Sequence, residues 1–170
     1  MEQLNPAALA RILDILHHAK DMTLATIRPD GFPQATTVSY VHDGLAIYTA
    51  VGLGSQKADN IQRNDKVSAT VNLDYADWNS IRGISLAGTA EFVQGQEHIE
   101  SVAQMFLYKF PAAKSMAQAA GPAPWQGLLF LRILPTVISL LDYRHGFGHT
   151  ELYAVSAADR YAGSTACHEK

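Results

Sequence analysis

The segment GLGSQKADNIQRN, residues 52–64, combines residue types that can bind an anion. The pattern predicts a short helix with Ser55 as its N-cap, while Gly52 and Gly54 allow a tight backbone turn in front of it. Lys57 falls in the first turn, where the positive end of the helix dipole disfavours a cation. Exposed amide groups, a hydroxyl and an ammonium together form an anion site, and phosphate is its commonest occupant. We therefore interpret the segment as a candidate phosphate site.

Two neighbouring residues extend this candidate site. Tyr48 and Thr49 end the strand-like run before the segment, and they place another hydroxyl near the same point. The alternative interpretation of Lys57 is a solvated surface lysine. The spacing of the glycines and the lysine is not that of a nucleotide-binding P-loop, so the residues alone indicate a phosphate site and no particular ligand.

The surrounding sequence predicts a mainly β fold. A one-sided apolar face follows the Asn5-Pro6 pair and predicts an N-terminal helix within residues 1–20. Another helical period begins near residue 96 and is interrupted at Pro111. Strands are predicted by alternation and β-branched content at 22–28, 34–41, 45–50, 66–73, 81–93, 127–134, 136–143 and 150–155.

Most connections between these strands are too short for parallel crossovers, so the sheet is expected to be antiparallel. A sheet this long in a compact chain usually closes into a barrel and thereby removes its edges. The predicted fold class is therefore mainly β (α+β), an antiparallel barrel with a few flanking helices. Residues 156–170 are small and polar, and we expect them to form a flexible tail.

Composition indicates one soluble domain spanning residues 1–170. Hydrophobic residues make up 48% of the chain and charged residues 17%, with a net charge of −3 and no long basic run, so nucleic acid is not an expected partner. No signal peptide or membrane-spanning run is recognised, and a cytoplasmic location is expected. Cys167 is the single cysteine, so an intrachain disulfide and a thiol metal cluster are excluded.

The stretch LAIYTAVGLGSQKADNIQRNDKVSATV, which contains the candidate site, resembles the core of the pyridoxamine 5′-phosphate oxidase-like, FMN-binding split-barrel superfamily. In that superfamily a strand ending in Tyr-Thr runs into a Ser-x-Lys helix, which closes in an Asn before the next strand; Asn64 and Val67 continue the match. The stretch IRGISLAGTAEFV is similar to the long strand of the superfamily, with an arginine at its start and Gly-x-Ala at 88–90. The resemblance spans roughly residues 20–94.

The resemblance implies a split β-barrel and a set of FMN contacts. Tyr48, Thr49, Ser55, Gln56 and Lys57 match the phosphate-binding pattern, in which Thr49, Ser55 and Lys57 would hold the FMN phosphate.

On the neighbouring strand, Thr37, Val38 and Ser39 would lie along the flavin ring. Arg82 would approach the cofactor from the partner subunit, because members of the superfamily bind FMN at a homodimer interface. The alternative for Arg82 is an exposed arginine at the start of a strand.

The sequence departs from the oxidase itself at several positions. An arginine and a lysine of the second strand, which also hold the phosphate in the oxidase, correspond to Gln34 and Ser39. The glutamine after the long-strand arginine corresponds to Gly83, and the C-terminal Trp and Arg-x-His pieces have no counterpart. The resemblance therefore implies flavin binding rather than pyridoxamine phosphate oxidation.

The stretch LDYRHGFGHTEL, residues 141–152, is a second unusual feature. Arg144, His145 and His149 cluster around two glycines, which is typical either of a loop over a ligand or of a solvated glycine-rich turn. Two histidines without a carboxylate or cysteine partner in the motif do not indicate a metal site, and no metal is predicted. Trp78 could pack at a dimer interface, in a core or on the surface.

These observations predict an FMN-dependent oxidoreductase that works as a homodimer on a small-molecule redox substrate. No catalytic acid or base is identified, because no candidate has a partner. The alternative is a non-catalytic protein of the same fold that binds or carries a flavin, a deazaflavin or haem.

Overall fold

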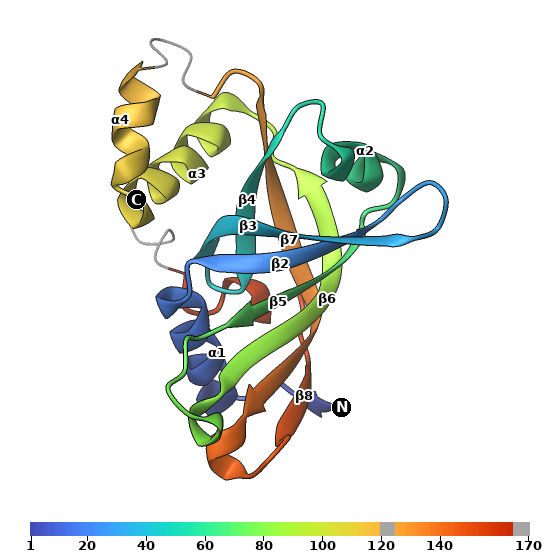
Figure 1. Cartoon of the computed structure of the whole chain (residues 1–170), viewed down its shortest axis with the longest axis vertical. Helices are drawn as coiled ribbons and strands as arrows, with labels where there is room; N and C mark the ends of the chain where they lie inside the picture. Colours follow the sequence, from blue (N-terminus) through green and yellow to red (C-terminus); the bar gives the residue numbers. More distant parts are fainter. Residues whose placement is uncertain (120–124, 165–170) are drawn as a thin grey trace.

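The computed structural model describes residues 1–119 and 125–164, which form a β-barrel with helices around it (Figure 1). Short 3₁₀ turns at Trp78–Ser80, Tyr143–His145 and Asp159–Tyr161 connect or follow its regular elements. The helices and strands in chain order are β1 Glu2–Gln3, α1 Pro6–His18, β2 Asp21–Ile27, β3 Pro33–Asp43, β4 Ala46–Gly52, α2 Gln56–Arg63, β5 Lys66–Asn72, β6 Arg82–Phe92, α3 Gln96–Lys109, α4 Ala112–Ala119, β7 Leu128–Asp142 and β8 Thr150–Ala154.

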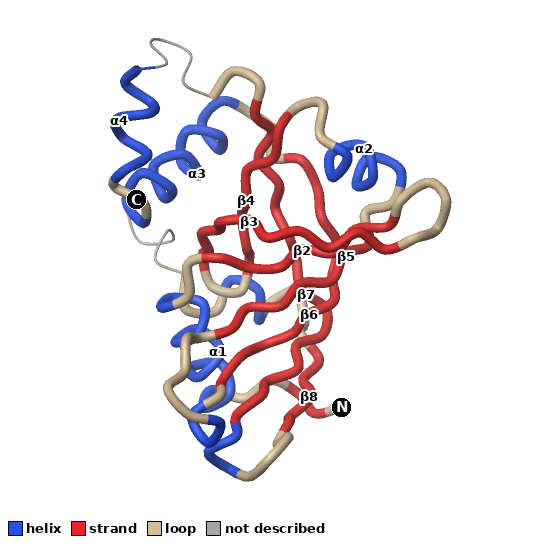
Figure 2. The backbone as a smooth tube through the Cα atoms, viewed as in Figure 1, coloured by secondary structure: helices blue, strands red, loops and turns tan. Residues whose placement is uncertain are grey.

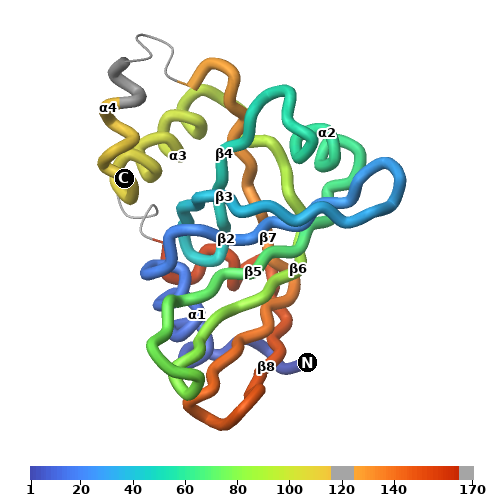
Figure 3. Tube along the Cα trace, in the orientation of Figure 1, coloured from blue at the N-terminus to red at the C-terminus, as the bar shows by residue number. Residues whose placement is uncertain are grey.

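The barrel closes through the long strands β6 and β7. Hydrogen bonding runs in the order β7-β4-β3-β2-β5-β6, and β6 pairs back onto β7, so six antiparallel strands form a ring. β6 and β7 are far apart in sequence and run side by side over most of their length (Figure 3). The first half of β7 pairs with β4 and the second half with β8. The predicted antiparallel split barrel is therefore confirmed.

The predicted break between two strands at Pro135 is wrong, because β7 runs through it without interruption. Pro135 lies between Ile133, which pairs with β4, and Val137, which pairs with β8. Proline is tolerated here because position 135 pairs with neither β4 nor β8, so its missing N–H interrupts no hydrogen bond to these strands. On the other side, the register with β6 shifts between Ala87 and Gly88. A Cβ at Gly88 would lie 2.3 Å from the Leu134 carbonyl oxygen, so this close approach requires glycine.

Two apolar cores hold the helices in place. The face of α1 that carries Ile12, Ile15 and Leu16 is fully buried in the larger core, which fills the barrel. The smaller core lies between α3 and the outer side of the sheet, and Tyr48 and Phe130 contribute to it. Figure 2 shows α1 and α3 on one side of the strands and α2 on the other. Among the described residues, no helix has the length and apolar character needed to cross a bilayer.

The predicted helices and strands otherwise match the structure, and two terminal features differ. β1 pairs in parallel with β8, and the sequence does not predict it because two residues carry no periodicity. In the segment predicted to be a flexible tail, the Arg160 carbonyl accepts a 2.8 Å hydrogen bond from the Leu45 amide, and the Ser164 hydroxyl donates to Asp43 at 2.7 Å. The remainder of that segment, residues 165–170 with Cys167, lies outside the described residues.

Candidate functional site at the start of α2

The first turn of α2 presents polar groups that can bind an anion. The Ser55 hydroxyl caps the helix by accepting the Ala58 amide at 3.3 Å, and the first intrahelical bond runs from Asp59 to the Ser55 carbonyl at 3.2 Å. The amides of Gln56 and Lys57 precede that bond, so no carbonyl of the helix accepts them. Lys57 is half-buried, and no described residue forms an ion pair with it. The Lys57 ammonium and unpaired backbone amides therefore lie together in the first turn of α2.

A buried polar network holds α2 against the β2–β3 hairpin. Asn60 is fully buried, and its side-chain amide donates to Thr26 at 2.9 Å and to Gln34 at 3.2 Å. The Gln56 side chain donates to the Asn60 oxygen at 3.2 Å. Gln34, which stands where the oxidase has a cation, is therefore used to position the helix. Asn60 was not predicted as a functional residue, although a polar residue on the apolar face of a short helix is a signal that the sequence contains.

The hydroxyls of Tyr48 and Thr49, which were predicted to extend the site from the preceding strand, lie elsewhere in the structure. Thr49 is fully buried and donates to the Ser39 carbonyl at 2.8 Å. Tyr48 points to the opposite side of β4, into the smaller core, with its ring 5.8 Å from that of His98; burial raises the pKa of its hydroxyl. Neither hydroxyl opens onto the first turn of α2 in this arrangement. Their contact with a ligand stays a prediction, and the anion-binding groups that are partly exposed at this turn are Ser55 and Lys57.

The outer face of the barrel beside α2 carries mainly small side chains, with the exposed Asp21 at one end and the exposed Lys66 at the other. Thr37 and Ser39 of β3 are exposed on this face, whereas the Val38 side chain packs against the barrel core. The Ser39 hydroxyl donates to Asp21 at 2.7 Å. Cross-strand pairing continues the face over four strands, with one row formed by Thr37, Thr23, Thr70 and Ser85 and a second formed by Ala35, Ala25, Ser68 and Ala87.

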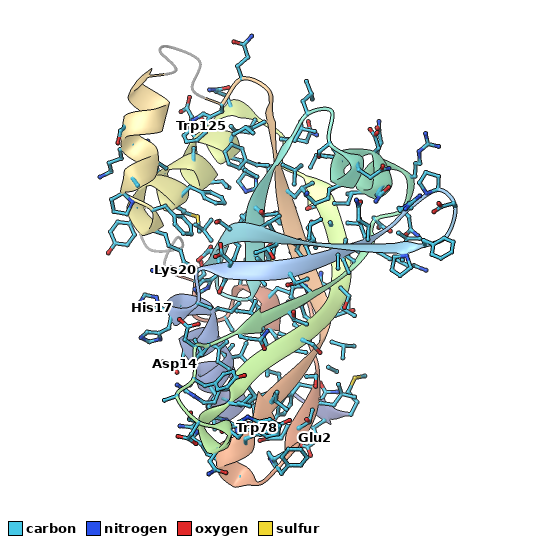
Figure 4. All side chains as sticks on the ribbon, viewed as in Figure 1. Glu2, Asp14, His17, Lys20, Trp78 and Trp125 are labelled. Carbon is cyan, nitrogen blue, oxygen red and sulfur yellow. The ribbon has the colours of Figure 1, made fainter. Side chains whose placement is uncertain are left out.

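Arg82 lies apart from Ser55 and Lys57 within one chain. It begins β6 beside the end of β5, whereas α2 leads into the start of β5 at Lys66. Its guanidinium donates to Asp14 of α1 at 3.0 Å, and Figure 4 shows Asp14 on the side of the molecule away from α2. A contact between Arg82 and a ligand at α2 would therefore require a second chain.

The loop between β7 and β8 is held by ion pairs. Arg144 donates to both oxygens of the buried Asp142, at 2.8 and 2.6 Å, and this keeps the pKa of Asp142 below its usual value. Glu151 accepts two bonds from Arg11, at 2.8 and 2.6 Å, and one from Tyr153, which lower its pKa to about 2.

The two loop histidines belong to the same region. The rings of His145 and His149 lie 5.3 Å apart, and His149 is 3.2 Å from Glu151. In the part of the chain that the structure describes, no group of three His, Cys, Asp or Glu residues could hold a metal ion. Trp78 stacks on the exposed Phe147 of this loop, with ring centroids 6.2 Å apart.

The closed six-strand barrel with its appended β8 defines the class of split-barrel proteins. Within this class, the family model described as pyridoxamine 5′-phosphate oxidase matches residues 9–126, more than half of the chain. The chain therefore belongs to this family.

Relatives of the chain carry several different descriptions. General stress protein 26 of Bacillus subtilis (strain 168) is 36% identical over 64 residues, which is 38% of this chain and 45% of that protein. A heme binding protein from Mycobacterium smegmatis has a similar structure, with a TM-score of 0.74, 20% identity and coverage of 94% of this chain and 61% of that one. The chain thus spans less than two-thirds of the length of either protein.

Two further solved structures share the fold. A putative pyridoxamine 5′-phosphate oxidase from Listeria innocua has a TM-score of 0.65 at 22% identity, with 79% of this chain and 98% of that one covered. HutZ, the heme storage protein from Vibrio cholerae, has a TM-score of 0.61 at 16% identity, with coverage of 89% and 94%. At these identities the likeness concerns the fold alone.

Proposed function

We propose that the protein is an FMN-dependent oxidoreductase that binds its flavin at the interface of a homodimer and acts on a small redox substrate. The observation that carries this proposal is the first turn of α2, where the ammonium of Lys57 has no acidic partner among the described residues and lies beside free backbone amides. A dianionic phosphate satisfies all of these donors at once.

The face of mainly small side chains beside α2 supports the position of the flavin ring. A flat ring system can lie closely against threonine, serine and alanine side chains, and Thr37 and Ser39 lie on β3, which neighbours the strand that leads to α2. The middle of this exposed sheet face, which carries no charged side chain, also suits contact with a second copy of the chain. In such a dimer, Arg82 of the partner subunit could reach the ring from the far end of β6.

Bound flavin would supply the hydride or electron transfer. The chain would anchor the phosphate through Ser55, Lys57 and the amides of the first turn. The paired sheet faces would orient the ring and exclude water. Gln34 and Ser39 add no positive charge, so Lys57 is the main cationic contact within one chain.

The proposal is tested by titrating the purified protein with FMN and following the quenching of flavin fluorescence. Lys57→Ala should weaken binding by roughly 10- to 150-fold, because a hydrogen bond to a charged group contributes about 1.5–3 kcal/mol. Lys114→Ala, on the exposed side of α4, is the matched control and should bind as the wild type does. Sedimentation of the wild-type protein should give a dimer. A monomer that does not quench FMN fluorescence would contradict the proposal.

Oxidoreductase activity needs a separate measurement. The FMN-loaded protein should transfer electrons from a nicotinamide donor to a small acceptor under single-turnover conditions. Tight FMN binding without any turnover would favour a flavin carrier, and preferential binding of a deazaflavin would change the assigned cofactor.

A second candidate function is haem binding. It is favoured by the two exposed imidazoles of His145 and His149, whose rings lie 5.3 Å apart, and by the haem-related names of two structural neighbours. Reconstitution with haem should then give a Soret band that is lost in His145→Ala or His149→Ala. A Soret band that neither substitution alters would show that neither histidine is a haem ligand.

A further inference from the structure

A cleft of about 870 Å³ opens between α1, α3 and the turn that joins β3 to β4. Its apolar part is formed by Val41 and Met105, and its polar part by His17, His42, Asp43, Gln104, Tyr108 and Lys109. Volumes of this size are typical of small-molecule sites, in which a mostly apolar surface surrounds a few polar groups.

Lys109 is the notable polar group of this cleft. It lies in the last turn of α3, and its ammonium is 3.9 Å from the centre of the Tyr40 ring. Its one hydrogen bond given by the structure goes to the Leu16 carbonyl at 3.4 Å, a long distance, and no described carboxylate forms an ion pair with it. Burial lowers the pKa of Lys109 to about 8, and the negative charge of Asp21 partly opposes this lowering. Keeping a half-buried ammonium charged without a neighbouring carboxylate costs free energy, unless a bound anion neutralises the charge.

The other titratable groups around Lys109 do not remove this requirement. Burial lowers the pKa of His42, whose ring lies 3.0 Å from the Gly44 carbonyl, so it is neutral near pH 7. Burial raises the pKa of the Tyr40 hydroxyl well above its usual value, and the hydroxyl donates to the Leu16 carbonyl at 2.8 Å. The titratable groups that act on the ammonium or line the same cleft are His17 from α1, Asp21 from β2, Tyr40, His42 and Asp43 from β3, and Tyr108 from α3 itself.

The cleft is separate from the first turn of α2. It uses the turn between β3 and β4, whereas α2 follows the other end of β4 at Gly52. Figure 4 shows His17, which lines the cleft, on the side of the molecule away from α2. A ligand in this cleft would therefore be independent of the flavin proposed above.

We propose that this cleft is a second binding site, which takes a small organic acid with an apolar body. The carboxylate, sulfonate or phosphate group of the ligand pairs with the Lys109 ammonium, while Val41, Met105 and Tyr108 contact the body. Cation–π contact with Tyr40 holds the ammonium in place before the anion arrives. His17 and Gln104 at the rim supply further hydrogen bonds to the acid.

The test uses 8-anilinonaphthalene-1-sulfonate as the probe, with fluorescence titration of the full chain at pH 7. The comparison compound is N-phenyl-1-naphthylamine, which has the same ring system without the sulfonate. Lys109→Met keeps the aliphatic stem and removes the charge, so it should weaken sulfonate binding by about tenfold or more and leave binding of the neutral amine within about twofold. Lys66→Met, at an exposed position of β5, should change neither affinity.

The pH dependence identifies the lysine directly. Wild-type affinity for the sulfonate should fall as the pH rises from 7 to 9.5, because Lys109 loses its proton through about pH 8. Lys109→Arg stays charged over this range and should bind equally well at both ends. Lys109→Arg therefore also serves as the control variant that retains both the fold and the positive charge.

Three results would overturn the inference. The first is equal affinity of the wild type and Lys109→Met for the sulfonate at pH 7. The second is a wild-type affinity that does not change between pH 7 and 9.5. The third is a loss in Lys57→Ala as large as that in Lys109→Met, which would show that the probe reports on the α2 site instead.

Discussion

The ion pairs near α1 and the first turn of α2 differ in how their charges are neutralised. At the α1 side, Arg11 forms a two-bond pair with Glu151, and Arg144 forms one with Asp142. At the α2 side, Lys57 has no acidic partner among the described residues and lies beside unused amides. Charges that are neutralised within the chain stabilise the fold, whereas a charge that lacks an internal partner is available to a ligand.

The largest expected effect is on stability at the α1 side. Ile12 is fully buried in the barrel core, so Ile12→Ala should lower the free energy of unfolding by about 2–5 kcal/mol. Denaturant unfolding measures this change. Leu9→Ala, on the same helix but only partly buried, should cost less. The FMN affinity of the protein that remains folded should not change, and a large loss of affinity in Ile12→Ala would show that the two sides are coupled.

An intermediate effect is expected at Glu151. Its pKa is lowered to about 2 from 4.5, so its ion pairs stabilise the folded state fully above pH 4.5, and this contribution is lost as the pH falls from 4.5 towards 2. At pH 7, Glu151→Gln should lower the free energy of unfolding by about 1–3 kcal/mol.

The difference between wild type and Glu151→Gln should shrink steadily below pH 4.5 in unfolding curves measured at several pH values. Glu100→Gln, exposed on α3, is the control and should stay within about 0.5 kcal/mol of the wild type. A difference that is the same at pH 7 and pH 2.5 would mean that the Arg11 pair does not act through its charge.

The smallest effect on stability, and the sharpest separation of roles, is expected at Ser55. Ser55→Ala removes the cap of α2 and should cost about 1 kcal/mol of stability, as measured by denaturant unfolding. Ser55→Asp restores a capping oxygen but adds a negative charge beside the proposed phosphate, so it should unfold like the wild type and bind FMN more weakly. Normal FMN affinity in Ser55→Asp would argue against a phosphate at this turn.

The local elements could be predicted from the sequence because their signals are local. Asn5 and Pro6 mark the start of α1, the turn at 29–31 marks the β2–β3 hairpin, and Pro111 separates α3 from α4. The anion-binding turn was also predictable, since Ser55 and Lys57 lie two residues apart at a single helix start.

Features that depend on distant strands could not be predicted in this way. Continuity of β7 through Pro135 depends on where β4 stops and β8 begins, which no local pattern records. The row of Thr37, Thr23, Thr70 and Ser85 becomes a single face only through the pairing of four strands.

The sequence by itself determined the order of the helices and strands, the antiparallel barrel and the chemistry of the α2 turn, because periodicity, capping and charge act over a few residues. Only the tertiary structure decided which polar groups remain exposed. Burial turned Thr49 and Gln34 into internal hydrogen-bonding residues, and it isolated Lys109 over Tyr40 in a cleft. Desolvation and strand pairing depend on residues far apart in the chain, so these assignments required the folded molecule.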